Sequence, residues 1–158
     1  MIETLNAKEQ PGSAAAICSP VKAISIRQPW AWLILNAGKD IENRSWPTNY
    51  RGRVLIHAGQ TMTKADFEAC CLFLNGISDE LQPEKLPMLR AKMNIPFFKY
   101  MLGGIVGEVE IVGCVTQSDS PWFCGEYGFV LRNAKPLDFV ACKGALGFFN
   151  PGNTRLTG

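Results

Sequence analysis

The chain has 158 residues, of which 47% are hydrophobic, and its formal net charge at pH 7 is +2. This length suits one domain with its own core and is too short for two ordinary domains. A nearly neutral chain excludes a protein that coats nucleic acid through its overall charge. A local basic patch remains possible, because residues 39–64 hold five Lys or Arg against two acids.

The cysteines and the hydrophobic pattern of the sequence indicate where in the cell the protein resides. Six cysteines occur without any C-x-x-C spacing, so we expect no zinc knuckle, no other metal site and no cofactor. Small buried thiols are typical of the reducing cytosol. No run reaches about 18 apolar residues, and residues 1–22 lack the features of a signal peptide. We therefore expect a soluble, cytoplasmic protein that does not contact a membrane.

Three regions follow from the pattern along the chain. Residues 1–21 show no periodicity and are expected to be a flexible leader. Residues 22–150 should form the folded domain, and residues 151–158 a tail, because Asn150-Pro151-Gly152 is typical of a structural end.

The domain is expected to begin with a strand, Ala23–Ile26, followed by a helix that starts at Pro29, where a missing N–H costs nothing. Gly38 suits the end of this helix. Four residues share its apolar face: Trp30, Leu33, Ile34 and Ala37.

Two further strands are predicted at residues 39–44 and 51–58. In the second, Val54, Ile56 and Ala58 alternate with residues on the other face. If the two strands are neighbours, their polar residues form one charged wall with Lys39 at its corner: Glu42, Arg44, Arg51, Arg53 and His57.

The middle of the chain predicts helices. Residues 61–74 have an apolar stripe at helical spacing, with Thr61 or Thr63 as the N-cap and Asp66 in the first turn. A short helix at residues 84–93 is also expected.

The C-terminal half predicts strands. The longest runs over residues 103–115, with Val109 and Ile111 on the core face together with Ile105, and Val106 and Cys114 opposite. Its glycines permit bulges of the kind that curve a sheet. Strands at 127–131 and 144–149, with a turn at 133–137, complete an α+β fold: a small, partly closed β-barrel of five or six strands with two or three flanking helices.

Lys39, Glu42 and Arg44 are the strongest candidates for a site. Cations inside a cleft hold a phosphate or an oxyanion more strongly than in water. A carboxylate between them could act as a general base or accept hydrogen bonds from a nucleobase. The alternative is a surface salt-bridge ladder, worth about 0–1 kcal/mol.

Other residues could extend this site. Arg27 and Gln28 lie at a helix start that could bind an anion. Trp46 and Tyr50, next to Arg51, could stack on bases. Trp30 is expected to pack in the core, Trp32 could be core or stacking platform, and His57 is expected to be a hydrogen-bonded imidazole. Two more cations are candidates for the rim of the cleft: Arg53 and Lys143.

The sequence resembles the ASCH domain family, which is related to the PUA-like RNA-binding barrels. The family hallmark is a G-x-K-x-x-E-x-R pattern after the first helix, and Lys39, Glu42 and Arg44 match its spacing. Ala37 stands at the hallmark glycine, and Gly38 directly precedes the lysine. The segments SIRQPWAWLI, YRGRVLIHA, YGFVL and KGALGFF also resemble the bacterial branch. The resemblance covers residues 22–150.

This resemblance implies a barrel whose Lys-Glu-Arg cleft binds single-stranded RNA or a nucleotide-like small molecule. Some members look like hydrolases: one bacterial group deacetylates acetylated cytidine with a lysine at the position of Lys39 and a threonine at that of Glu42, and ribonuclease activity is attributed to relatives. Two hypotheses follow, a binding module and a hydrolase with Lys39 and Glu42 as catalytic residues. Fold alone does not separate them.

Overall fold

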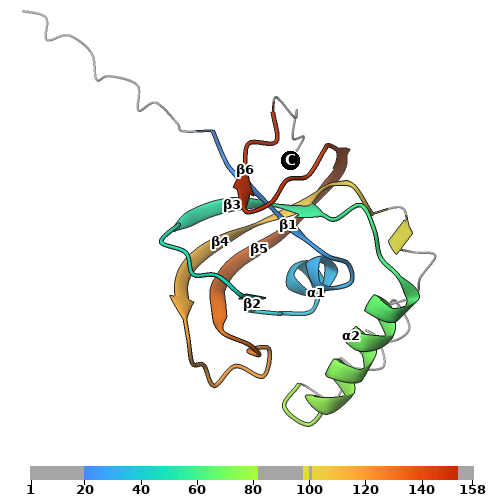
Figure 1. Ribbon diagram of the computed structural model, residues 1–158, viewed down its shortest axis with the longest axis vertical. Helices are drawn as coiled ribbons and strands as arrows, with labels where there is room; N and C mark the ends of the chain where they lie inside the picture. The colour runs from blue at the N-terminus through green and yellow to red at the C-terminus, as the bar shows by residue number, and fades with distance from the viewer. Residues whose placement is uncertain (1–19, 82–97, 100, 153–158) are drawn as a thin grey trace, which may run out of the picture.

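The computed structural model describes residues 20–81, 98–99 and 101–152, which form a six-stranded mixed sheet and two helices (Figure 1). In chain order the elements are β1 (Ala23–Ile26), α1 (Trp30–Asn36), β2 (Ile41–Arg44), β3 (Gly52–Ala58), α2 (Lys64–Gly76), β4 (Gly104–Val115), β5 (Tyr127–Ala141) and β6 (Phe148–Phe149). Most of the predicted leader, the predicted helix at 84–93 and most of the predicted tail lie outside the described residues.

The sheet has the order β2-β5-β4-β3-β1-β6 and curls into a half-barrel (Figure 1). β1 and β3 pair in parallel, and the other pairs are antiparallel. Trp46, in the segment between β2 and β3, touches Phe129 of β5 and Phe148 of β6 edge-on, with ring centroids 5.1 and 5.8 Å apart. This side chain therefore connects β6, at one edge of the sheet, with β5, the neighbour of the other edge strand, and the predicted partly closed barrel is confirmed.

α1 joins the barrel core to α2. Ala31, Ile34 and Leu35 pack against the inner residues of the strands, whereas Trp32 and Leu33 pack with residues of α2. Figure 1 shows α1 within the curve of the sheet and α2 outside it. In the described part of the chain, no helix is long and apolar enough to cross a membrane.

The ends of both helices follow their local sequence. α1 ends at Asn36, and Gly38 turns the chain toward β2 with a φ of 72°, a conformation that glycine adopts without a steric cost. Thr63 caps α2 by accepting a hydrogen bond from the backbone N–H of Asp66, and Asp66 accepts one in return. The two predicted helices, including the cap, are confirmed.

The predicted core of β3 and β4 is confirmed in part. Val54, Ile56, Val109 and Ile111 are buried together inside the barrel. Val106 and Cys114 also join this cluster, and Ile105 belongs to a different one, so their predicted faces were wrong. Register shifts between β4 and β5 at 105/107, 108/110 and 111/113 explain the error, because each bulge breaks the strict alternation of a strand.

β5 is longer than predicted. Residues 133–137 continue the strand instead of forming a turn, with Asn133 at a φ of 54°. Pro136 is tolerated because β2 pairs only with residues 127–130, which leaves one side of β5 unpaired beyond them. The last strand is shorter than predicted, since only Phe148–Phe149 pair, with β1.

The predicted charged wall is wrong, because β2 and β3 are not neighbours. β5 and β4 lie between them in the sheet. Their connection, residues 45–51, is therefore not the loop of a hairpin. Arg53 therefore pairs with Glu108 of β4, and Glu42 lies opposite Phe129 of β5.

Candidate functional site

β2 and the segment that leads into it from α1 carry three charged side chains. Lys39 is 3% exposed; its ammonium donates to the carbonyl of Ile41 and lies 3.5 Å from Glu42 Oε2. The ammonium also lies 5.8 Å from the centre of the Trp30 ring, within the range of a cation–π contact. A buried ammonium needs such partners, because removing an unpaired charge from water costs several kcal/mol.

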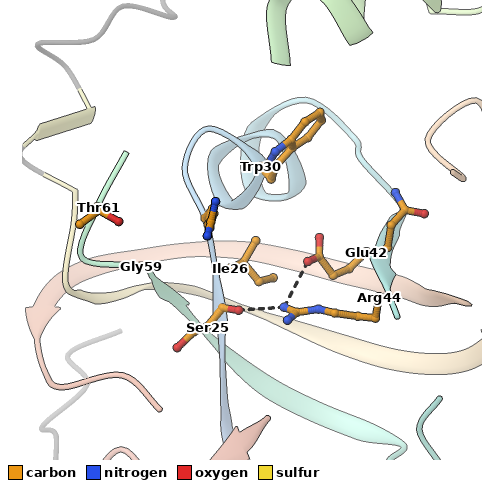
Figure 2. Close-up of a pocket in the computed structure, with 9 residues that line it drawn as sticks. Ser25, Ile26, Trp30, Glu42, Arg44, Gly59 and Thr61 are labelled. Atoms are coloured by element: carbon orange, nitrogen blue, oxygen red, sulfur yellow. Dashed lines mark hydrogen bonds and ion pairs between the residues drawn. The ribbon is translucent and has the colours of Figure 1, made fainter. Parts of the chain in front are cut away.

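Arg44 completes the cluster from the other side. Its Nη2 lies 3.2 Å from Glu42 Oε1 and donates to the carbonyl of Ser25 on β1, at 2.8 Å (Figure 2). The guanidinium carbon is 5.9 Å from the Trp46 ring centre. Arg44 Nε is buried and has no hydrogen-bond partner within the described ranges. Glu42, 8% exposed, thus lies between two cations; Lys39, Glu42 and Arg44 are called the charged cluster below.

A pocket of about 410 Å³ opens beside the charged cluster. In Figure 2, Trp30 projects from α1 on one side of the pocket, and Arg44 and Glu42 lie on the side of β2. Arg44 points toward Ser25, and Thr61 lies on the opposite side of the view. This larger pocket is lined by Ser25, Ile26, Arg27, Trp30, Glu42, Asn43, Arg44, Gly59 and Thr61.

A second pocket, of about 270 Å³, lies between β2 and α2. It shares Trp30, Glu42 and Asn43 with the larger pocket, so the two meet at these residues. The other residues that line this smaller pocket are Lys39, Ala69, Phe73 and Cys124.

Asn43 fixes one wall of the smaller pocket. Its amide donates to the carbonyl of Trp122 at 2.8 Å and accepts from the backbone N–H of Cys124 at 2.8 Å. Ser120 adds a hydrogen bond to Asp40 at 2.5 Å. These bonds hold the loop that follows β4 against β2 and bring Cys124 to the pocket.

The structure brings only some of the sequence-predicted residues to these pockets. Lys39, Glu42 and Arg44 lie together. Arg27 joins Glu42 and Arg44 at the larger pocket, with a side chain that is 73% exposed and 3.3 Å from Asp66.

Gln28 is fully buried, and its amide is used inside the protein. It accepts from the N–H of Trp32 at 3.0 Å and donates to the carbonyl of Met101 at 3.3 Å. The N–H groups of Ala31 and Leu33 bond to backbone carbonyls. These three N–H groups at the helix start are therefore not free to bind an anion.

The remaining predicted residues do not line either pocket. Trp46 packs against Phe129 and Phe148, and Tyr50 stacks on Phe148 and donates to the carbonyl of Arg53 at 2.6 Å. Burial raises the pKa of the Tyr50 hydroxyl.

The last three predicted cations are exposed and line neither pocket. Arg51 donates to the carbonyls of Thr48 and Tyr50, Arg53 pairs with Glu108, and Lys143 lies in the segment before β6. Their predicted role as ligand contacts stays a prediction.

His57 is a hydrogen-bonded, buried imidazole, as predicted. It is 1% exposed, with Nδ1 3.1 Å from Ser25 Oγ and Nε2 3.0 Å from the carbonyl of Cys142. Ser25 Oγ donates to the carbonyl of Ala145 at 3.2 Å. We call Ser25 and His57 the histidine cluster. No group of three or more His, Cys, Asp or Glu that could hold a metal ion occurs among the residues that the structure describes.

Sequence reasoning missed several pocket residues. Trp30 looked like core by its helical spacing, and it does contact core residues, but one side of it borders both pockets. Asn43 lies between Glu42 and Arg44, and its polarity within a strand could have marked it. The others come from distant segments, and no local pattern points to them: Ser25, Gly59, Thr61, Ala69, Phe73 and Cys124.

Comparison with known proteins gives one finding. A family model described as the ASCH domain matches residues 24–144, which is most of the chain and includes every residue that lines the two pockets. No curated protein matches the chain.

Proposed function

The chain belongs to the ASCH domain family, and on that premise we propose that it binds single-stranded RNA or a nucleotide-like small molecule in the cleft lined by Lys39, Glu42 and Arg44. One observation carries the proposal: Glu42 and Arg44 of the charged cluster border one open pocket of about 410 Å³ together with the Trp30 ring, and Lys39 lines the adjoining smaller pocket. That size falls within the range of roughly 300–1,000 Å³ that is usual for small-molecule sites.

The lining suits a nucleotide chemically. Arg27 and Arg44 supply cationic donors for phosphate, and the Glu42 carboxylate can accept from a base or a ribose hydroxyl. Trp30 offers an aromatic surface of the kind on which unpaired bases stack, worth about 1–3 kcal/mol per base. Glu42 is 8% exposed, so a base must leave its helical stack to reach it. This favours single strands over duplexes.

Titration of a labelled single-stranded RNA, at two or more salt concentrations, tests the proposal. Arg44→Ala should weaken binding and lower the salt dependence of the affinity by about one phosphate contact. Lys135→Ala removes the same charge from an exposed position on β5 that lines neither pocket, and should have little effect. Equal affinities for wild type and a folded Arg44→Ala protein would place the ligand elsewhere.

A hydrolase is the second candidate, and a separate observation favours it. Lys39 and Glu42 both line the smaller pocket, with Nζ and Oε2 3.5 Å apart, so one small ligand could touch both. In that case Lys39 would stabilise developing negative charge and Glu42 would move the proton. Incubation with single-stranded RNA and with acetylated cytidine, followed by chromatography, separates the two functions: product from either substrate shows chemistry, and binding without product supports a binding module.

A further inference from the structure

The two pockets differ in charge although they meet at the same residues. Two arginines and one glutamate line the larger pocket, a formal charge of +1. One lysine and one glutamate line the smaller pocket, a formal charge of 0. The net positive charge of the larger pocket favours a phosphate more than the neutral lining of the smaller pocket does.

The smaller pocket has the features that a nucleobase requires. Trp30 and Phe73 line it and contact each other edge to face, with centroids 5.4 Å apart and 80° between planes, so a base stacked on one ring would turn its own edge toward the other. Lys39 and Glu42 place a donor beside an acceptor, and the Watson–Crick edge of every base offers an acceptor beside a donor. Ala69 also lines this pocket, and its small side chain leaves space for a base.

In the larger pocket, Arg27 is more available to a phosphate than Arg44 is. Arg44 Nη2 already serves Ser25 and Glu42, and its Nε is buried. The Arg27 side chain is 73% exposed and pairs with Asp66 at 3.3 Å. An exposed pair of this kind is worth little, so a phosphate can compete for the guanidinium.

We propose, on the basis of the proposed function, that the two pockets are subsites for one phosphorylated nucleoside. The base occupies the smaller pocket, beside the Trp30 and Phe73 rings and the Lys39–Glu42 pair. The sugar crosses at Glu42 and Asn43, which both pockets share, and the phosphate lies against Arg27 in the larger pocket.

The experiment compares the four ribonucleosides with their 5′- and 3′-monophosphates in amide and indole NMR titrations of the full chain. A nucleoside should shift the indole N–H of Trp30 and the amide of Ala69. A monophosphate should also shift the amides of Gly59 and Thr61 and bind at least about tenfold more tightly. Inorganic phosphate alone should shift only the larger-pocket amides.

Two variants separate the subsites. Ala69→Leu narrows the smaller pocket and should weaken nucleoside and monophosphate by a similar factor, about tenfold or more. Its matched control is Ala65→Leu, one turn earlier on α2 and exposed, which lines neither pocket and should change neither affinity. Arg27→Ala should cost about tenfold for the monophosphate and leave the nucleoside unchanged.

The outcomes distinguish this inference from the proposed function. Equal losses for nucleoside and monophosphate in Arg27→Ala, or no loss for either in Ala69→Leu, overturn the assignment of subsites. Binding of RNA without binding of any nucleoside or monophosphate overturns the inference and leaves the proposed function standing. Absence of binding to RNA and mononucleotides alike overturns both.

Discussion

Two polar groups of residues meet at Ser25, and they differ in which side chains line a pocket: Glu42 and Arg44 do, and His57 does not. In the charged cluster, Arg44 donates to the Ser25 carbonyl, and Glu42 and Arg44 border open space. In the histidine cluster, Ser25 Oγ and both ring nitrogens of His57 have partners, and the chain at residues 142–145 covers them. Histidine, a common catalytic residue, is therefore enclosed in this protein. The salt bridge between Glu42 and Arg44, which the sequence alone could also have placed on an ordinary surface, lines a pocket that is open to a ligand.

The largest effect is expected at Glu42. In the hydrolase alternative, Glu42→Gln should lower turnover by about a hundredfold to ten-thousandfold, the usual worth of a placed general acid or base. The same change should lower the free energy of unfolding by about 3 kcal/mol, because it leaves the ammonium of Lys39 buried without its carboxylate. Turnover and chemical denaturation of the purified variant measure the two effects separately.

A double variant provides the control for this prediction. Lys39→Met with Glu42→Gln removes both charges of the pair, so its loss of stability should be smaller than the sum of the two single losses. Additive losses would show that Lys39 and Glu42 do not stabilise each other. Full activity in a folded Glu42→Gln protein would return the charged cluster to binding alone.

At His57, a substitution is expected to lower stability without changing function. His57→Ala should lower the free energy of unfolding by about 3 kcal/mol, because it empties a fully buried site and leaves Ser25 Oγ and the carbonyl of Cys142 without this partner. Binding of RNA by the folded variant should stay within about twofold of wild type. Urea denaturation followed by RNA titration checks both, and a loss of binding with unchanged stability would move His57 into the functional site.

Gly144 should show how tightly the histidine cluster is enclosed. An added Cβ would lie 2.5 Å from His57 Cε1 and 2.8 Å from Ser25 Oγ, closer than real Cβ contacts. Gly144→Ala should therefore lower the free energy of unfolding by about 2 kcal/mol through overpacking. Gly76→Ala, where an added Cβ meets nothing within 4 Å, is the matched control and should be neutral or slightly stabilising. Equal stability of the two variants would show that residues 142–145 move aside easily.

The comparison also explains what the sequence could predict. Local patterns identified β1, both helices and the core of β3 correctly, because each depends on spacing, a cap or a turn within a few residues. The charged cluster was found for the same reason, since Lys39, Glu42 and Arg44 lie within six residues of one another. The strand faces of β4 were wrong where bulges break the alternation, and bulge positions depend on the partner strand.

Pocket walls that come from other segments were not predictable in this way. Phe73 and Ala69 reach the smaller pocket because α2 packs against α1, and Cys124 arrives with a loop that Asn43 holds. The wrong pairing of β2 with β3 has the same origin. Neighbours in sequence were assumed to be neighbours in the sheet, whereas the long strands β4 and β5 lie between them.

The smallest effect is expected at Asp66, which connects the rim of the larger pocket to α2. Hydrogen bonds from the Thr63 backbone N–H and then from the Thr63 hydroxyl lower the pKa of the Asp66 carboxyl, with a smaller contribution from Arg27. A carboxyl whose pKa is lowered by folding contributes stability above its unfolded pKa near 4, and this contribution is lost as the pH falls through the folded pKa.

Asp66→Asn isolates that charge because it keeps the shape and one acceptor oxygen. It should lower the free energy of unfolding by about 0.5 kcal/mol at pH 7, since a carboxylate in the first turn of a helix is worth about 0.3–1 kcal/mol. The difference from wild type should vanish on going from pH 5 to pH 2, measured by urea denaturation. Glu68→Gln, in an exposed pair with Lys64 on the same helix, should show almost no difference at pH 7. Asp66→Asn also removes the carboxylate that pairs with Arg27, so it should tighten monophosphate binding slightly and leave nucleoside binding unchanged. Two results would show that Asp66 does not act through its charge. One is a stability difference that persists at pH 2, and the other is a weaker affinity for the monophosphate.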